Sequence, residues 1–257
     1  MVGTFFFVFG TVFAALWFTT SLWPAFLLLG VFFGRSFFQR AAHTTAVQRN
    51  QTAVNLLNAG RIDEAGRIFD DLSDGERNTA AHPVYVFNRA VAYVLQGRPR
   101  RAYSLFNAVD RSGAFTFGFA SSYLPLLYIE IATCLALMGQ IDAAREFRNR
   151  VGKTLDGGDW GRVVFLDALL LVRTGDHRGA EAYIREHWRS AEGMLRVPTM
   201  KALRLIHAFS LAHLGKHGTQ EFRSLVEGVR PCRRGEFDWI GAEWPEILAF
   251  LRSQGLR

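Results

Sequence analysis

The hydrophobic positions along the chain follow two patterns that change near residue 40. Residues 5–33 are apolar, aromatic or small throughout, with no ionisable side chain. From about residue 44 onward, apolar residues recur at helical spacing in stretches that short polar turns containing glycine separate. This change predicts an all-α chain in which one long apolar helix precedes a series of amphipathic helices.

The apolar stretch is long enough to cross a membrane. As a single helix, residues 5–33 would be about 43 Å long, against roughly 30 Å of hydrocarbon in a bilayer. Pro24 could kink this helix or end one part of it. Division at residues 19–21 would leave arms of about 12 to 14 residues, each too short for a span. We therefore expect one N-terminal transmembrane helix, with residues 1–38 as the anchor.

The distribution of cations predicts the orientation of this anchor. Arg35, Arg40 and Arg49 follow the apolar stretch without an acidic residue among them, and no Lys or Arg precedes it. Because cations collect on the cytoplasmic side of a span, we expect a single-pass protein of the cytoplasmic (inner) membrane whose repeat domain is cytoplasmic. The alternative is a secreted or periplasmic protein with a cleaved leader. The missing basic n-region and the poor cleavage site after Gly34 disfavour it.

Small residues within the apolar stretch could pack helices together. Gly10 and Ala14, and again Gly30 and Gly34, have the small-xxx-small spacing that lets helix backbones approach closely. Glycine is also common in spans that pair with nothing. A structural subunit packed permanently in a larger membrane assembly is therefore a second alternative.

One unit recurs five times after residue 44, and a glycine marks each copy. These glycines, spaced 36 to 42 residues apart, are Gly60, Gly97, Gly139, Gly175 and Gly215. Alanine stands seven residues before every one of them, Leu or Tyr four before, and alanine five after in four of the five. Alanine lets two helices cross closely, and glycine ends the first helix in a left-handed conformation. The pattern predicts five helical hairpins over residues 39–235.

The segments around these glycines resemble tetratricopeptide (TPR) repeats, which are helix-turn-helix units of about 34 residues that stack into an α-solenoid. The likeness is carried by NAGRIDEAGRIF (58–69), LQGRPRRAYSLF (95–106) and LMGQIDAAREF (137–147). The third unit has its aromatic, Phe147, one place early, and the fifth has Gln220 in place of alanine. Periods longer than 34 predict longer helices or loops and a less regular superhelix.

The residues after the last hairpin are predicted to cover its apolar face. An end hairpin of a repeat protein needs such a cover, because hairpins bury their faces only against neighbours. Residues 236–257 are expected to form a C-terminal capping helix, and Pro245 within them can stand in the first turn of a helix. The apolar stripe of this capping helix comprises Trp239, Ile240, Trp244, Ile247, Leu248 and Leu251. Two other apolar stretches, 123–139 and 163–172, fall in the repeat register, so they are expected to be buried first helices and not further spans.

The resemblance also implies a binding surface. In TPR proteins, ligands lie in the concave groove of the first helices, at positions that include ten, nine and six residues before the glycine. The corresponding residues are Asn50, Val54, Phe87, Asn88, Val91, Ile129, Glu130, Thr133, Phe165, Leu169, Leu205 and Phe209. Such a groove would suit an amphipathic helix of a protein partner. The competing interpretation, which stays open, is that these side chains pack against one another in a tightly wound superhelix.

Motifs for catalysis, metal binding or cofactor binding are missing from the sequence. There is no P-loop, nucleophile elbow, HExxH or dinucleotide fingerprint. His213 and His217 have a metal-ligand spacing, but Gly215 is expected to end their helix between them, with no third ligand nearby. Cys134 falls beside core positions, which indicates a small buried side chain. We therefore expect no enzyme, no metal, no cofactor and no small-molecule substrate.

Charge disfavours nucleic acid as a partner. Of the net charge of +7, +3 comes from the arginines of residues 35–50, and the remaining 207 residues share only +4. A nucleic-acid-binding domain would concentrate cations on its folded part. The sequence therefore predicts a non-catalytic, membrane-anchored scaffold or adaptor that binds a protein partner at the cytoplasmic face of a membrane, within a membrane protein complex.

Overall fold

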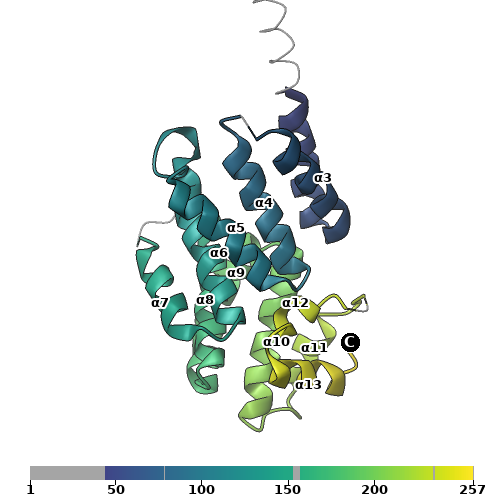
Figure 1. Ribbon diagram of the computed structural model, residues 1–257. Helices are drawn as coiled ribbons and strands as arrows, with labels where there is room; N and C mark the ends of the chain where they lie inside the picture. The colour runs from purple at the N-terminus through teal and green to yellow at the C-terminus, as the bar shows by residue number, and fades with distance from the viewer. Residues whose placement is uncertain (1–43, 78, 153–156, 234, 257) are drawn as a thin grey trace, which may run out of the picture. The chain divides into compact units, whose positions relative to one another are not determined.

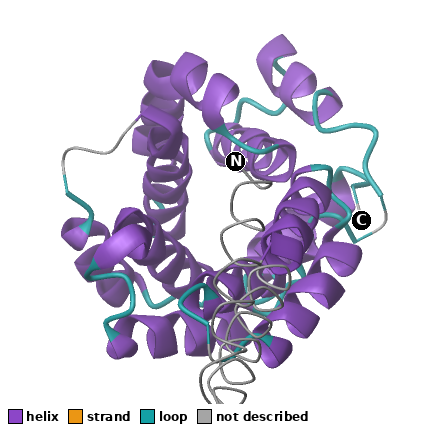
Figure 2. Ribbon diagram, turned by 90° about the horizontal axis from the view of Figure 1, so that it is seen from above, coloured by secondary structure: helices purple, strands orange, loops and turns teal. Residues whose placement is uncertain are grey.

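The computed structural model describes residues 44–77, 79–152, 157–233 and 235–256. The chain divides into two compact units, Met1–Arg49 and Asn50–Arg257, and the second is described here by itself. The predicted transmembrane anchor and its small residues lie outside the described residues. Every regular element in the described residues is helical, which confirms the all-α fold for that part of the chain (Figure 2).

Within the described residues, five helical hairpins follow one another along the chain, and Figure 1 shows how they are arranged. Helical residues 50–58 and α3 (Ile62–Gly75) form the first hairpin of this unit, and α4 (His82–Leu95) and α5 (Pro99–Ser112) form the second. The third and fourth comprise α6 (Leu124–Leu137) with α7 (Ile141–Arg150), and α8 (Gly157–Arg173) with α9 (His177–Met194). The fifth is α10 (Val197–His213) with α11 (Gln220–Glu227). A 3-10 helix, η1 (Gly118–Tyr123), precedes α6, and α12 (Asp238–Gly241) and α13 (Pro245–Ser253) end the unit.

Each hairpin turns at one of the five marker glycines. All five have a positive φ, between 71° and 78°. In every turn, the N–H of the residue after the glycine donates to the carbonyl of the Leu or Tyr four residues before it, as from Arg98 to Tyr93 at 2.9 Å. This bond satisfies a carbonyl that the end of a helix would otherwise leave free. The predicted left-handed helix ends are therefore confirmed.

Buried alanines hold the two helices of each hairpin close together. The alanines at the two repeat positions have no exposed surface: Ala53, Ala90, Ala132, Ala168 and Ala208 before the glycines, and Ala65, Ala102, Ala144 and Ala180 after them. A methyl group is the largest side chain that such a close helix crossing accepts. The long repeat periods have two visible sources, namely η1 with the connection before it and helices of 17 or 18 residues at α8, α9 and α10.

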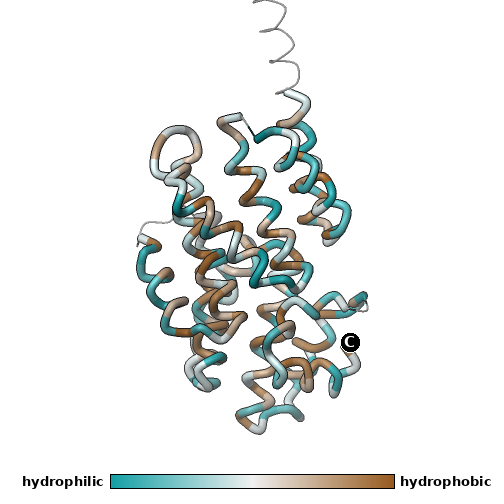
Figure 3. The backbone as a smooth tube through the Cα atoms, viewed as in Figure 1, coloured by the Kyte–Doolittle hydropathy of each residue, from teal (hydrophilic) through white to brown (hydrophobic). Residues whose placement is uncertain are grey.

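The first helices of the hairpins carry most of the hydrophobic core. Figure 3 shows brown stretches along α6 and α8, whereas α7 is largely teal. Among the described residues one stretch, Ala120–Leu137, is long and apolar enough to cross a membrane, and 56% of it is buried inside the fold. A core helix passes the same test of length and composition. We therefore assign this stretch, which contains α6, to the core, as its repeat register predicts.

The C-terminal stretch forms two short helices, not the one capping helix that the sequence predicts. Pro245 is in the first turn of α13, as expected. The residue before a proline is driven into an extended conformation, and Trp244 there has φ −138° and ψ 86°. In addition, the backbone at Gly241 touches Leu248, since a Cβ at Gly241 would lie 2.3 Å from Leu248 Cδ2. The chain therefore bends sharply between α12 and α13.

Replacing a turn glycine should destabilise the repeat through backbone strain alone. At Gly175 (φ 78°) an added Cβ meets no atom within 4 Å, so the cost of Gly175→Ala is the left-handed conformation itself, about 1–2 kcal/mol. Gly193, inside α9, is an equally open but helical position. There alanine should leave stability unchanged or raise it by up to about 1 kcal/mol. Urea unfolding of the full chain in detergent measures both, and equal effects would contradict the left-handed turn.

Candidate functional site

A pocket of about 120 Å³ lies among the first helices of three hairpins. Its walls come from α4, α6 and α8, from the junction between α9 and α10, and from α12. The lining residues are Val91, Val94, Leu95, Ile129, Glu130, Thr133, Arg162, Phe165, Met194, Leu195, Arg196, Pro198, Thr199 and Trp239. We call it the inner pocket. Five of the twelve predicted groove residues line it, namely Val91, Ile129, Glu130, Thr133 and Phe165.

The polar groups of the inner pocket are largely satisfied by the protein itself. Glu130 and Arg162 form an ion pair with Oε1 and Nη1 2.7 Å apart, and their side chains are 14% and 20% exposed. The Thr133 hydroxyl donates to the Ile129 carbonyl one helical turn away at 2.8 Å. The remaining surface is mainly apolar. The pocket is therefore suited to an apolar side chain. Such a side chain would lie beside the Glu130–Arg162 ion pair, whose charges neutralise each other.

Exposed apolar side chains lie where α9 joins α10. Met194 is 40% exposed and lines the inner pocket, and Val197, two residues from the lining Thr199, is 62% exposed. Large apolar side chains grouped beside a pocket are characteristic of binding surfaces. This rim, which we define as Met194 and Val197, is the exposed part of the site.

The other predicted groove residues lie outside the inner pocket. Phe87 is buried in an aromatic cluster, with its ring 5.4 Å from Phe106, 5.9 Å from Phe115 and 5.7 Å from Tyr123. Leu169 and Leu205 have no exposed surface. These side chains act as core, so the structure brings only part of the predicted set together at an open site.

The predicted groove residues of the first hairpin contact the second hairpin or pack against the core, and they do not line an open surface. The Asn88 amide donates to Asn50 Oδ1 at 2.9 Å, which joins α4 to the helix before α3. Val54 is half-buried against the core. Asn50, Asn88 and Val54 therefore connect hairpins. Their role in partner binding stays a prediction.

The C-terminal stretch covers part of the interior that the sequence assigns to a partner. Trp239 of α12 packs against Phe165, with ring centres 6.0 Å apart, and lines the inner pocket. Trp244 packs against Phe209 at 5.4 Å. Phe250 of α13 lies equally close to Phe209. The chain itself thus occupies the predicted groove at Phe209, which leaves the inner pocket and its rim as the accessible portion.

Two arginines fix this C-terminal stretch to distant hairpins. Arg100, at the start of α5, makes two hydrogen bonds of 2.7 Å to the Glu243 carboxylate, 143 residues away. The guanidinium of Arg173 lies 4.8 Å from the Trp244 ring centre. Burial lowers the pKa of Arg173. The cover therefore reaches back to the second and fourth hairpins and does more than close the fifth.

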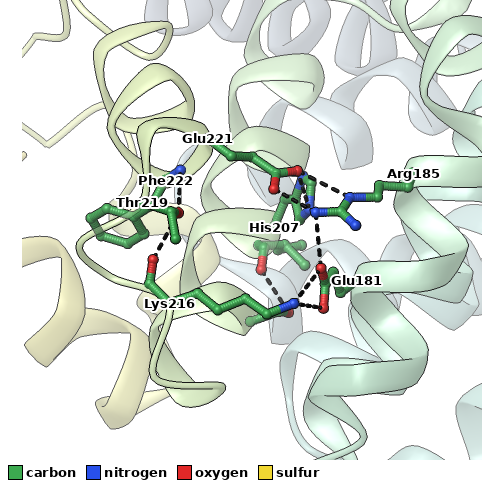
Figure 4. Close-up of polar contacts among 9 residues, drawn as sticks. Glu181, Arg185, His207, Lys216, Thr219, Glu221 and Phe222 are labelled. Carbon is green, nitrogen blue, oxygen red and sulfur yellow. Dashed lines mark hydrogen bonds and ion pairs between the residues drawn. The ribbon is translucent and has the colours of Figure 1, made fainter.

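A second group of polar side chains joins α9 to the fifth hairpin (Figure 4). Lys216 donates to both carboxylate oxygens of the buried Glu181 at 2.8 Å. Arg185 lies 3.1 Å from Glu181 and donates from Nε to Glu221 Oε1 at 3.1 Å. The hydrogen bond from Arg185 lowers the pKa of Glu221. Residues from α9, from α11 and from the turn before α11 thus form one network, which the sequence did not predict because its members are up to 40 residues apart.

His207 lies beside this network without a hydrogen bond. Its side chain is 4% exposed, and neither ring nitrogen has a hydrogen-bond partner. Nε2 is 3.7 Å from Glu221 Oε1, which is an ion pair only when the ring is protonated. Burial lowers the pKa of His207, with Glu221 acting in the opposite direction. The ring is therefore neutral at pH 7, with one nitrogen able to donate and the other able to accept.

Metal and cysteine chemistry receive no support in the described ranges. No group of three or more His, Cys, Asp or Glu side chains within them is placed to hold a metal ion. His213 stacks on His177 with ring centres 4.0 Å apart. Burial lowers the pKa of His177 and raises that of the Cys134 thiol. Cys134 is a buried core side chain, as its repeat position predicts.

The inner pocket contains residues that sequence reasoning missed. Met194 and the residues at the start of α10 fall outside the repeat register, so no periodic signal marks them. Trp239 belongs to the apolar stripe of the predicted capping helix, but that pattern does not indicate that it reaches the first helices. Arg162 could have been found, since an arginine on the first helix of one hairpin faces a glutamate, Glu130, on the first helix of the preceding hairpin. Opposite charges on neighbouring first helices are the pattern that would have revealed this pair.

The hairpins and their glycine turns define the class of this protein as an α-solenoid of TPR-like helical hairpins. No protein-family model and no curated protein sequence matches the chain. Among solved structures, the chain is similar to TPR-like repeats described as those of a kinesin light chain from Podospora anserina. The identity is 20%, the TM-score 0.46, and the match covers 71% of this chain and 92% of that one. At these values the likeness supports no conclusion about function.

Acid should destabilise the fold through its buried histidines. The pKa of His207 is lower in the folded chain than in the unfolded chain, so its contribution is present above about pH 6.5 and is lost as the pH falls. His82 and His177 act in the same direction. The free energy of unfolding should therefore fall from pH 7 to pH 5, less steeply in His207→Gln. The exposed His217→Gln is the matched control, and a slope that His207→Gln leaves unchanged would argue against a neutral buried ring.

Proposed function

We propose that this chain is a non-catalytic, membrane-anchored TPR-type scaffold that binds a protein partner at the cytoplasmic face of a membrane, within a membrane protein complex. The observation that carries the proposal is the inner pocket with its exposed apolar rim. Stacked hairpins present side chains from several repeats on one continuous surface. This surface suits recognition of another protein through a few apolar anchor residues.

The size of the inner pocket limits how a partner would bind. A helix with its side chains is about 10 Å across, too wide for a pocket of about 120 Å³. The pocket would therefore accept one apolar side chain, while the rest of an amphipathic helix lies across Met194 and Val197. The partner chemistry proposed here is an amphipathic helix with one protruding apolar residue.

The anchor part of the proposal rests on the sequence. Residues 5–33 are long enough for a span, and the arginines that follow favour a cytoplasmic repeat domain. Anchoring would raise the local concentration of the repeat domain near membrane proteins. The two alternatives remain a secreted or periplasmic protein with a cleaved leader and a permanently packed structural subunit.

Charge on the rim should remove partner binding without disturbing the core. The double variant Met194→Glu, Val197→Asp changes exposed side chains only. The partner that co-purifies with the wild-type chain in detergent should fall at least about tenfold in quantitative mass spectrometry, because an apolar anchor region becomes charged. Phe117→Asp, at a phenylalanine that is 86% exposed and lies outside the rim, is the control and should retain the partner.

The same experiment cannot use the buried groove residues. Phe87 and Phe165 are 3% and 4% exposed, so an aspartate at either site would bury a charge and disturb folding. Recovery of the partner at wild-type levels with the charged rim would contradict docking at the inner pocket.

Membrane attachment should depend on the apolar leader. The full chain is expected to stay in the membrane pellet after extraction at high pH, and deletion of residues 1–38 should release it to the supernatant. Sequencing of the mature N-terminus separates the alternatives, because a start near residue 40 would show a removed leader and contradict the anchor. An intact leader in a chain that high pH extracts would contradict it equally.

A further inference from the structure

A second pocket, of about 490 Å³, lies between α9, α10 and α11. We call it the outer pocket. It shares no lining residue with the inner pocket, so an inference about it is independent of the proposed function. Three arginines line it together with Trp188, His207 and two carboxylates, those of Glu192 and Glu221. Its volume is in the range of small-molecule sites in proteins.

The arginines that line the outer pocket carry more positive charge than the two carboxylates in its lining neutralise. Arg185 is matched by the Glu221 carboxylate through two hydrogen bonds. Arg204 donates from Nη1 to the Gly228 carbonyl at 3.3 Å, and its Nη2 forms an ion pair at 3.3 Å with Glu192, whose side chain is 54% exposed. Arg189 is exposed and makes no hydrogen bond or ion pair with any described residue. The guanidinium of Arg189 is therefore open to an incoming anion, and Arg204 would join it by exchanging the exposed Glu192 for that anion.

His207 supplies the second, independent observation. It lines the pocket, its side chain is 96% buried, and both of its nitrogens lack a hydrogen-bond partner. Buried polar groups in folded proteins are nearly always hydrogen-bonded, and one left unpaired is costly. Both nitrogens are closed to solvent, so a ligand oxygen would accept the unused N–H once the side chains around the ring shift to admit it.

Trp188 provides a flat apolar surface in the same pocket. The Arg204 guanidinium carbon lies 5.6 Å from the Trp188 ring centre, and the His207 ring is 6.0 Å away. Leu225 adds apolar surface from α11. A ring carried by the ligand could therefore lie against Trp188, while a charged group faces the arginines.

We infer that the outer pocket binds a small organic anion, a phosphate or carboxylate attached to a flat ring. Guanidinium groups bind both anions in a two-point geometry, and His207 would donate a further hydrogen bond. The apolar wall would favour an aromatic anion over an inorganic one. This assigns to the fifth hairpin a ligand site separate from the docking of a protein at the inner pocket.

Phenyl phosphate is the probe that tests the inference. In titration calorimetry with the full chain in detergent, it should bind more tightly than inorganic phosphate, and phenol should not bind measurably. The double variant Arg189→Gln, Arg204→Gln should weaken binding of phenyl phosphate at least about tenfold, since it removes two charged donors. Arg223→Gln, at an exposed arginine of α11 outside the pocket, is the matched control and should change the affinity less than twofold.

A second measurement needs no variant. The ring signals of His207 in a histidine-labelled wild-type chain should shift as phenyl phosphate is added. Lack of binding at about 10 mM would overturn the inference. So would an unchanged affinity in the double variant, or binding that leaves the His207 signals in place. Each of these results leaves partner docking at the inner pocket unaffected, so the two proposals fail separately.

Discussion

The left-handed glycine at each hairpin turn is the constraint on which this architecture depends. The glycine ends the first helix, and the N–H of the next residue donates to a carbonyl of the last helical turn that would otherwise lack a partner. The backbone conformation of the glycine therefore helps to set the direction of the second helix. The same turn geometry recurs five times, and the alanines on either side of the turns are fully buried between the helices.

Placement of the two pockets follows from the stacking of the hairpins. The first helices face one another, so side chains such as Val91, Ile129 and Phe165 converge at the inner pocket. The outer pocket instead lies between second helices, where α9 and α11 diverge over the surface of α10. An ion pair neutralises the polar groups of the inner pocket, whereas the outer pocket keeps a buried histidine without a partner. Two faces of one repeat array therefore differ in chemistry.

The sequence predicts the hairpins well because their determinants are local and periodic. Gly139, Ala132 and Ala144 lie within one hairpin, and each occupies the conformation or the buried position that its spacing indicates. The sequence could not predict in this way that side chains of the C-terminal stretch fill part of the interior of the array. Trp239 reaches the inner pocket, and Trp244 reaches Phe209, only because of the curvature that several hairpins accumulate. Curvature depends on small angles at every interface, and no single residue pattern encodes it.

The bond between Arg100 and Glu243 has a consequence for how the repeats unfold. In an open array, each hairpin touches only its neighbours, and the ends can fray while the middle persists. Here a surface ion pair and two tryptophans connect the C-terminal helices to the second and fourth hairpins. Loss of order at the C-terminus would therefore remove packing from the centre of the array. Residues 50–256 should behave as one cooperative unit, with the slow, non-local closure step that distant contacts impose on folding.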